Sequence, residues 1–176
     1  MKHQVIILDG PDGCGKTNIG LALAERLGIS YFKNEGEWDH FADKDKTEYF
    51  LNCIRYRHPH LLEFLNATNT SVVLDRAYPS EFVYPGLFNR ETDPRAVNLC
   101  DVMCAEMNAK IIIPCRSDYS EVKDQFDFVD EEMLNKIHKG YKDFSCWTSC
   151  DVLMLNVDDE DLEREIKDIM VFLEGE

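Results

Sequence analysis

One stretch of the sequence decides the fold, and it reads Gly10-Pro11-Asp12-Gly13-Cys14-Gly15-Lys16-Thr17. It directly follows Val5–Leu8, an apolar run typical of a strand that is covered on both faces. Residues 18–27 carry apolar side chains at helical spacing, and Gly28 provides a stop. The stretch is therefore predicted to be a glycine-rich turn that links a buried strand to a helix.

This turn fits the pattern Gly-x-x-x-x-Gly-Lys-(Ser/Thr), the P-loop signature, and the strand and helix that the signature requires are both predicted. Its glycines let the backbone curl so that several N–H groups point at one anion, next to the positive end of the helix. Lys16 is expected to reach the β- and γ-phosphates of a nucleotide, and the Thr17 hydroxyl to bind Mg²⁺. The predicted nucleotide-binding residues are Gly10, Asp12, Gly13, Cys14, Gly15, Lys16 and Thr17.

The segment after the last predicted strand indicates which nucleotide base the protein binds. GTPases commonly carry Asn-Lys-x-Asp there, whereas this chain reads Asn156-Val157-Asp158-Asp159 and lacks the lysine. The difference weakens a GTPase interpretation, and the P-loop itself predicts binding of ATP or GTP.

Apolar, strand-like segments alternate with helical patterns along the whole chain. Strands are expected at residues 5–8, 29–33, 71–74, 111–113 and 152–155, and helices at residues 18–27, 46–66, 95–107, 128–144 and 160–173. Pro59 is expected to interrupt the second helix, and Pro114 to end the fourth strand. The pattern predicts a single α/β domain of the P-loop NTPase fold over residues 1–176. Its five-stranded parallel sheet would carry helices on both faces.

Charge and cysteine content limit the partners and the compartment. Lys and Arg number 19 against 34 Asp and Glu, a net charge of −15, which argues against a bulk electrostatic grip on polymeric nucleic acid. Small anionic ligands held by a few local cations remain compatible with this balance. The seven cysteines, the absence of a signal-like start and of any apolar run of roughly 18–20 residues predict a cytoplasmic chain with free thiols and no membrane segment.

The third predicted strand ends in two charged residues, Asp75 and Arg76. A carboxylate at the carboxyl end of a strand beside the P-loop strand commonly provides a second handle on Mg²⁺. A fixed guanidinium next to it can neutralise the charge that builds up on a transferring phosphoryl group. We therefore predict that Thr17 and Asp75 hold the metal and that Lys16 and Arg76 act in catalysis.

Three segments together resemble the thymidylate kinases, within the wider nucleoside and nucleotide kinases. The P-loop resembles that family's G-x-D-G-x-G-K-T, and residues 75–84 (DRAYPSEFVY) resemble its D-R-Y-x-x-S-x-x-A-Y signature. Between them, Thr47-Glu48 followed by Arg57 and His60 matches a T-E…R-x-x-H helix. The likeness is clear over residues 5–86 and fainter over residues 128–144 and the last strand and helix.

The resemblance implies roles for the matched positions. Asp12 would contact the sugar of the acceptor, Tyr84 would line its pocket, and Arg57 and Arg76 would hold its phosphate or the transferring group. Glu35 would lie near the attacking oxygen and the metal. The implied substrate-binding residues are Asp12, Glu35, Glu37, Phe50, Arg57, Arg76, Ser80 and Tyr84.

The departures from the family concern the substrate more than the reaction. The family's R-E-P-G loop reads Asn34-Glu35-Gly36-Glu37, so its arginine is missing. The base-stacking aromatic falls at Cys53, where Phe50 one turn earlier would substitute, and the glutamine after the signature tyrosine is Pro85. The expected lid, residues 115–127, holds only Arg116 and Lys123 as cations, and Arg116 is assigned a catalytic role.

Two acceptor classes therefore stay open. The leading hypothesis is transfer from Mg²⁺-ATP to a pyrimidine deoxynucleoside monophosphate. Glu35 and Glu37, with Trp38, also resemble deoxynucleoside kinases, in which such a glutamate is the general base on a sugar hydroxyl. The alternative acceptor is thus a free hydroxyl on a deoxynucleoside or on a hydroxymethylated pyrimidine base, including one within DNA.

A third hypothesis belongs to a different class: a nucleotide-binding regulator without catalysis, against which the retained Lys16, Thr17, Asp75 and Arg76 speak. The resemblance also implies a homodimer, since such kinases often form one. The Leu- and Met-rich segment at residues 95–107 fits either an interface or an ordinary core.

Overall fold

A five-stranded, fully parallel sheet forms the centre of the protein in the computed structural model, which describes residues 3–34, 46–120, 122 and 129–175. The strand order is β2-β3-β1-β4-β5. The strands are β1 (Val5–Leu8), β2 (Ser30–Lys33), β3 (Val72–Asp75), β4 (Lys110–Cys115) and β5 (Asp151–Asn156). The predicted α/β class, strand number and strand direction are confirmed.

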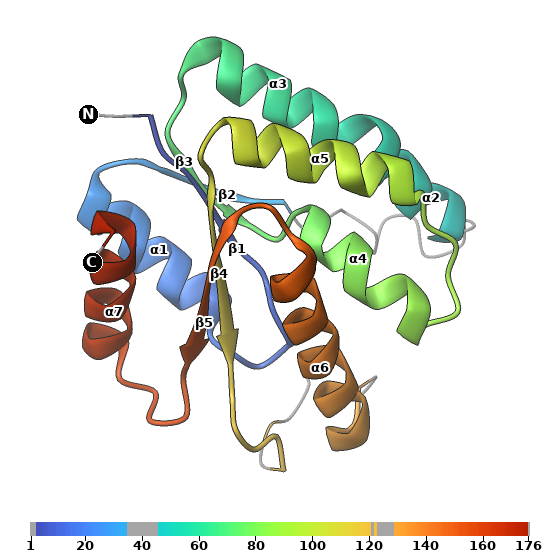
Figure 1. The fold of residues 1–176 in the computed structure, drawn as a ribbon. Helices are drawn as coiled ribbons and strands as arrows, with labels where there is room; N and C mark the ends of the chain where they lie inside the picture. Colours follow the sequence, from blue (N-terminus) through green and yellow to red (C-terminus); the bar gives the residue numbers. More distant parts are fainter. Residues whose placement is uncertain (1–2, 35–45, 121, 123–128, 176) are drawn as a thin grey trace.

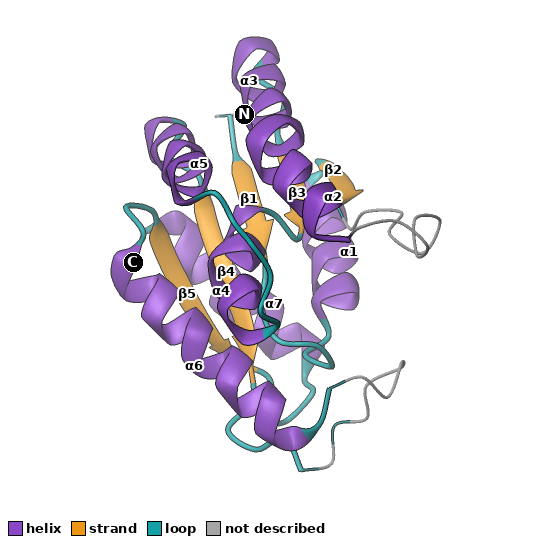
Figure 2. Cartoon of the chain, turned by 90° about the vertical axis from the view of Figure 1, so that its right-hand side faces the viewer, coloured by secondary structure: helices purple, strands orange, loops and turns teal. Residues whose placement is uncertain are grey.

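Helices cover both faces of this sheet (Figures 1 and 2). One face carries α1 (Lys16–Leu27) and α7 (Leu162–Glu174), which contact each other. The other face carries α3 (His58–Thr68), α4 (Tyr78–Leu87), α5 (Pro94–Glu106) and α6 (Glu131–Trp147), with α3 on α5 and α4 on α6. Among the described residues, no helix is long and apolar enough to cross a bilayer.

The β1 strand shows why the strands read as unbroken apolar runs. Val5 and Ile7 belong to the core beneath α3–α6, whereas Ile6 and Leu8 belong to the core beneath α1 and α7. All four side chains are buried. Because both pleat faces are covered, no position on this strand calls for a polar residue.

No helix is predicted for residues 78–87, where the structure has α4, a helix that contains Pro79 and Pro85. Pro79 lies in the first turn, where the missing N–H costs nothing. Pro85 lies inside the helix and cannot donate to the carbonyl of Glu81, and the hydroxyl of Thr92 donates to that carbonyl instead, at 3.2 Å. A tertiary hydrogen bond thus replaces the helical one.

The predicted interruption of the second helix is present, but it precedes Pro59. Helix α2 (Lys46–Asn52) passes through a π-helical turn, Cys53–Arg57, into α3, whose first turn contains Pro59. The expectation that Pro114 ends its strand is wrong, since β4 continues to Cys115. Pairing of β4 with β1 stops at Ile112, so at Pro114 the strand is paired only with β5 on its other side. Proline is tolerated there, because no neighbouring strand on the β1 side needs its N–H.

Polar or charged residues stand at the carboxyl ends of four of the strands. Asp9 follows β1, Asn34 follows β2, Asp75 ends β3 and Arg116 follows β4. Parallel strands end at the same edge of a sheet, so these residues border one region, into which the P-loop also projects. All seven cysteines are free, four of them buried, as expected from the sequence.

Candidate active site

The P-loop joins β1 to α1 in a conformation that two of its glycines make possible. Gly13 has φ of 75°, and a Cβ there would collide with the side chain of Val122. At Gly10, a Cβ would lie 2.8 Å from the carbonyl oxygen of Pro114. Chain geometry and close packing against β4 and the segment after it therefore both require glycine in this loop.

Lys16 folds back over its own loop. Its ammonium donates to the carbonyl oxygens of Gly10 at 3.1 Å and Pro11 at 2.7 Å, and lies 3.7 Å from a carboxylate oxygen of Asp12. Burial, followed by the neighbouring Arg76 guanidinium, lowers the pKa of Lys16. The loop thus positions a desolvated cation beside backbone N–H groups, which suits an anionic ligand.

Thr17 and Asp75, the predicted metal ligands, are in direct contact. The Thr17 hydroxyl donates to Oδ2 of Asp75 at 3.0 Å, and the hydroxyl of Tyr31 on β2 donates to the same oxygen at 2.6 Å. Oδ1 of Asp75 is buried and has no hydrogen-bond partner among the described residues. A hydroxyl beside a carboxylate oxygen that is unused fits Mg²⁺, which takes few protein ligands and completes its shell with water and phosphate oxygens.

Asp9 is a site residue that the sequence analysis missed. This fully buried carboxylate accepts hydrogen bonds from the backbone N–H groups of Gly10, Ala77 and Ser80 and from the hydroxyls of Ser80, at 2.8 Å, and Tyr141, at 2.7 Å. It therefore ties the start of the P-loop to the start of α4 and to α6. The available signal was an acidic residue between an apolar strand and a P-loop glycine.

Arg76 links the P-loop to α4. Its backbone is left-handed, with φ of 67°. Its guanidinium forms an ion pair with Asp12 and lies 3.4 Å from the carbonyl oxygen of Gly10. The same group lies 3.3 Å from the hydroxyl of Tyr84 and 3.4 Å from that of Ser80. Four residues predicted to bind substrate, Asp12, Arg76, Ser80 and Tyr84, are thus brought together.

The two acidic side chains of this cluster, Asp12 and Tyr84, have shifted pKa values. Burial acts to raise the pKa of Asp12, but Arg76 and Lys16 outweigh it, and the pKa lies below its ordinary value. Burial raises the pKa of Tyr84, so its hydroxyl stays protonated and donates to Asp12 at 3.3 Å. The cluster therefore holds one ionised carboxylate, one neutral phenol and one guanidinium.

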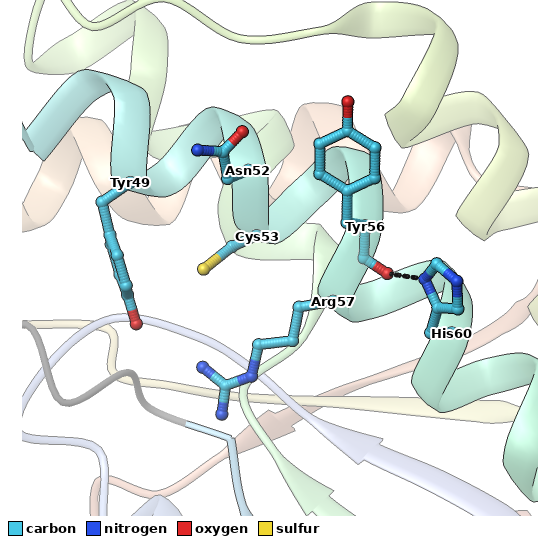
Figure 3. Close-up of a pocket in the computed structure, with 6 residues that line it drawn as sticks. All are labelled: Tyr49, Asn52, Cys53, Tyr56, Arg57 and His60. Carbon is cyan, nitrogen blue, oxygen red and sulfur yellow. Dashed lines mark hydrogen bonds between the residues drawn. The ribbon is translucent and has the colours of Figure 1, made fainter.

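Arg57 lies on the wall of a separate, open hollow of about 490 Å³ (Figure 3). The hollow is lined by Tyr49, Asn52, Cys53, Tyr56, Arg57 and His60, all from α2, the π-helical turn and α3. Tyr49 and Arg57 extend to one side of the helix, and the Tyr56 ring extends to the opposite side. Arg57 therefore lies on this hollow, whereas Arg76 lies against the P-loop at Gly10 and Asp12.

The remaining predicted residues are placed as follows. Arg116 lies against the P-loop, with its guanidinium 3.4 Å from the carbonyl oxygen of Gly13 and paired to Glu160 at 2.6 Å. Phe50 has one ring face covered by the guanidinium of Arg90, 3.8 Å from the ring centre. Glu35, Glu37 and the lid positions 121 and 123–127 lie outside the described residues.

Two further arginines differ from expectation or were missed. Arg55, which as a rare cation in an acidic chain was expected from the sequence to converge with Lys16, Arg57 and Arg76 on one pocket, pairs instead with Asp93 at 2.7 Å, and nearly half of its side chain is exposed. Arg90, which carried no sequence signal, forms a buried ion pair with Glu81. Both outcomes depend on the loop after α4, whose path the sequence pattern did not indicate.

Comparison with known proteins places the fold. No family model matches the chain, and no curated protein matches it by sequence. Thymidylate kinase from Ehrlichia chaffeensis aligns with a TM-score of 0.71 and 16% identity, covering 97% of this chain and 98% of that one. The YorR protein from Bacillus subtilis, solved in complex with phosphorylated GDP, aligns with a TM-score of 0.67 and 19% identity. The alignment covers 97% of this chain and 95% of that one.

A third neighbour is deoxyadenosine kinase from M. mycoides, solved with dCMP and a flexible dCDP as products. It aligns with a TM-score of 0.58 and 19% identity, covering 98% of this chain and 100% of that one. These alignments span nearly the whole length of each protein, whereas the identities are low. The chain therefore has the fold of the P-loop nucleoside and nucleotide kinases.

Proposed function

We propose that this protein is a Mg²⁺-ATP-dependent kinase that phosphorylates a pyrimidine deoxynucleoside monophosphate. The observation that carries the proposal is the position of Arg76. Its guanidinium contacts the P-loop at Gly10 and Asp12 and, on the other side, Tyr84 of α4. One cation therefore borders both the expected donor site and the expected acceptor site, as phosphoryl transfer requires.

On the donor side, Lys16 and the P-loop N–H groups would bind the β- and γ-phosphates, and Thr17 and Asp75 would hold Mg²⁺. The metal would supply positive charge to the phosphate oxygens when bound. Lys16 would exchange its two carbonyl partners for phosphate oxygens. Arg116, which already contacts Gly13 at 3.4 Å, would add a cation from the start of the lid.

On the acceptor side, an oxygen of the acceptor's phosphate would form a bond to the γ-phosphorus while the bond from that phosphorus to the β–γ bridging oxygen breaks. ADP leaves with that electron pair. A phosphate oxygen is already ionised at neutral pH, so this step needs no general base. Arg76 would stabilise the negative charge on the phosphoryl group during its transfer. Arg57 would hold the acceptor's phosphate, and its sugar would be oriented by Asp12, Ser80 and Tyr84.

A second candidate acceptor is a free hydroxyl, and the environment of Asn34 favours it. Asn34 occupies the position of the family's loop arginine, is buried, and pairs with His58 at 3.3 Å. No cation is therefore offered at this position to an acceptor phosphate. Glu35 or Glu37 would then act as the general base on a hydroxyl of a deoxynucleoside or of a hydroxymethylated pyrimidine.

The test is an ADP-release assay that offers the whole chain, with Mg²⁺-ATP, deoxynucleoside monophosphates, deoxynucleosides and hydroxymethylated DNA in turn. We expect a pyrimidine monophosphate to stimulate release, and Lys16→Ala to lower that turnover at least about 100-fold, because a preorganised charge on the phosphates is lost. Lys139→Ala, on the exposed face of α6, is the matched control.

Each acceptor class gives a distinct outcome. Stimulation by nucleosides or DNA alone would move the proposal to the hydroxyl acceptor. ATP binding without transfer to any acceptor would favour a regulator. Unchanged turnover in Lys16→Ala would contradict the kinase proposal altogether.

A further inference from the structure

Tyr31 on β2 has no role in the proposed phosphoryl transfer, yet it contacts a residue that does. Its hydroxyl donates to Oδ2 of Asp75 at 2.6 Å. It is also the least exposed residue of its strand, since Ser30, Phe32 and Lys33 are all exposed. The one sheltered side chain of this edge strand is therefore a phenol that is hydrogen-bonded to an expected metal ligand.

The register of the sheet brings Tyr31 and Asp75 together. Tyr31 is paired with Val73 of β3, and Asp75 lies two residues further along that strand. Residues two apart on a strand share a face of the sheet, so Tyr31 and Asp75 lie on the same face as diagonal neighbours. This face is the one that α1 covers, and the first turn of α1 holds Thr17. The carboxylate is thus reached by one hydroxyl from the edge strand and by another from α1.

Helix α1 leaves room for the Tyr31 ring at Gly20. A Cβ at this position would lie 2.6 Å from Cε2 of Tyr31 and 3.0 Å from Cδ1 of Leu8. Glycine inside a helix is less stable than alanine, so local propensity does not explain its presence in the middle of α1. Close packing of the ring against the helix does explain it, and this packing fixes where the hydroxyl lies.

The two hydroxyls occupy the same oxygen of Asp75. Thr17 donates to Oδ2 at 3.0 Å and Tyr31 donates to it at 2.6 Å. Oδ1 is buried and has no hydrogen-bond partner among the described residues. Since a carboxylate oxygen accepts about two hydrogen bonds, Oδ2 is fully used. Oδ1 is therefore the oxygen that Asp75 can offer to a cation or to its bound water.

A carboxylate with one available oxygen does not suit all divalent cations equally. Mg²⁺ is small, keeps several of its waters and binds through one or two carboxylates together with phosphate oxygens. Ca²⁺ takes six to eight oxygen ligands and often binds both oxygens of one carboxylate. Because hydrogen bonds hold Oδ2, Asp75 would lose them if it bound a cation through both oxygens. The arrangement thus favours Mg²⁺ over Ca²⁺.

From these contacts we propose that Tyr31 is a positioning residue, whose hydroxyl holds Asp75 so that only Oδ1 is available to the metal of a bound nucleotide, and which thereby favours Mg²⁺ over Ca²⁺. Gly20 admits the ring that places this hydroxyl. The inference rests on the donor half of the proposed function, in which Thr17 and Asp75 hold Mg²⁺. It does not depend on which acceptor the protein phosphorylates.

The experiment measures, by calorimetry on the full chain, the Kd of the non-hydrolysable ATP analogue AMP-PNP without metal, with Mg²⁺ and with Ca²⁺. The metal enhancement is the Kd without metal divided by the Kd with metal. Tyr31→Phe keeps the ring and removes only the hydroxyl. We expect it to lower the Mg²⁺ enhancement about 10-fold, as loss of a group that orients a metal ligand does. The Ca²⁺ enhancement and the metal-free Kd should each change less than about twofold, because neither depends on a one-oxygen Asp75.

The matched control is Tyr78→Phe. It removes a phenol hydroxyl that donates to another buried carboxylate, Asp101, at 2.7 Å, away from the P-loop. We expect the metal-free Kd and both metal enhancements to stay at the wild-type values. The two variants therefore separate loss of a buried tyrosine–aspartate hydrogen bond in general from loss of this one.

Gly20→Ala provides a second test that keeps the Tyr31 hydroxyl. The added methyl would displace the Tyr31 ring, so it should lower the Mg²⁺ enhancement in the wild-type background and cause no further loss in Tyr31→Phe. Circular dichroism of each variant checks that it is folded. Equal losses from Gly20→Ala in both backgrounds would overturn the inference, because the helix and not the hydroxyl would then be responsible.

The outcomes separate this inference from the proposed function. A wild-type Mg²⁺ enhancement in Tyr31→Phe, or equal losses with Mg²⁺ and Ca²⁺, would overturn the inference and leave the proposed function standing. A selective loss of the Mg²⁺ enhancement, in a chain that phosphorylates no acceptor, would support the inference and refute the proposed function. Absence of any Mg²⁺ enhancement in the wild-type chain would refute both the inference and the donor half of the proposed function.

Discussion

At the scale of single residues, Asp9 shows how the P-loop is anchored. This carboxylate accepts from three backbone N–H groups and two hydroxyls, contributed by the P-loop, by the start of α4 and by α6. Such a carboxylate fixes these segments relative to one another, because a segment that moved away would leave its own buried donors without a hydrogen-bond partner.

We expect Asp9→Asn to lower the free energy of unfolding by about 2 kcal/mol, because the amide NH₂ would face N–H and O–H donors in a buried site. Urea denaturation followed by circular dichroism measures the change. Asp143→Asn, on the exposed side of α6, should change the free energy by less than about 0.5 kcal/mol. A loss at Asp9 as small as that of the control would mean that these contacts are not needed for stability.

At the scale of elements, the junction of the π-helical turn with α3 buries a histidine. Burial, with a smaller contribution from Arg57, lowers the pKa of His58 to about 4. Its Nδ1 lies 3.3 Å from the amide nitrogen of Asn34, the residue after β2. The imidazole is therefore kept neutral in the folded protein and faces the edge strand of the sheet.

Because the pKa of His58 is lower in the folded state than its ordinary value of 6.5, the unfolded chain binds a proton first as pH falls. Stability from this group is complete above pH 6.5 and is lost towards pH 4, by on the order of 3 kcal/mol. Denaturation at several pH values should show this slope in wild type and a flatter one in His58→Asn. Parallel slopes would show that His58 does not titrate on unfolding.

Glu81 on α4 acts in the opposite sense. Burial raises its pKa to about 7, although Arg90 acts against this shift. The stability associated with it is present below pH 4.5 and is lost as pH rises to 7. The slope assigned to His58 is therefore read as the difference between variant and wild type, in which the contribution of Glu81 cancels.

Also at this scale, the elements differ in how far the sequence predicts them. The strands are recognisable because burial on both faces leaves only apolar residues, as in β1. Helix α4 is not, because Pro85 opposes it locally and a hydrogen bond from Thr92 supports it. Local propensity is informative only where tertiary contacts do not replace it.

The residues of the candidate site also differ in how far the sequence predicts them. Lys16, Thr17, Asp75 and Arg76 could be predicted because each stands at a fixed spacing from a strand end or a glycine turn. Asp9 and Arg90 could not, since their roles depend on which segments meet in three dimensions. Asp9 receives donors from residues up to 132 positions away along the chain.

At the scale of the whole molecule, the net charge of −15 describes the surface and not the site. Arg76, Arg90 and Arg116 each pair with a carboxylate at or beside the expected site. A net charge of this sign would repel a polymeric nucleic acid, whereas a mononucleotide needs only the local cations. The net charge thus favours a small acceptor over modified DNA in the proposed function.

The central claim is that one guanidinium, Arg76, serves both halves of a phosphoryl-transfer site. The measurement that tests it most directly is kcat for acceptor phosphorylation by Arg76→Lys, alongside its affinity for ATP. Lysine keeps the charge and loses the planar fork. We predict that kcat falls about 100-fold while the Kd for ATP changes less than about threefold. An unchanged kcat, or a kcat loss matched by an equal loss of ATP affinity, would contradict the account.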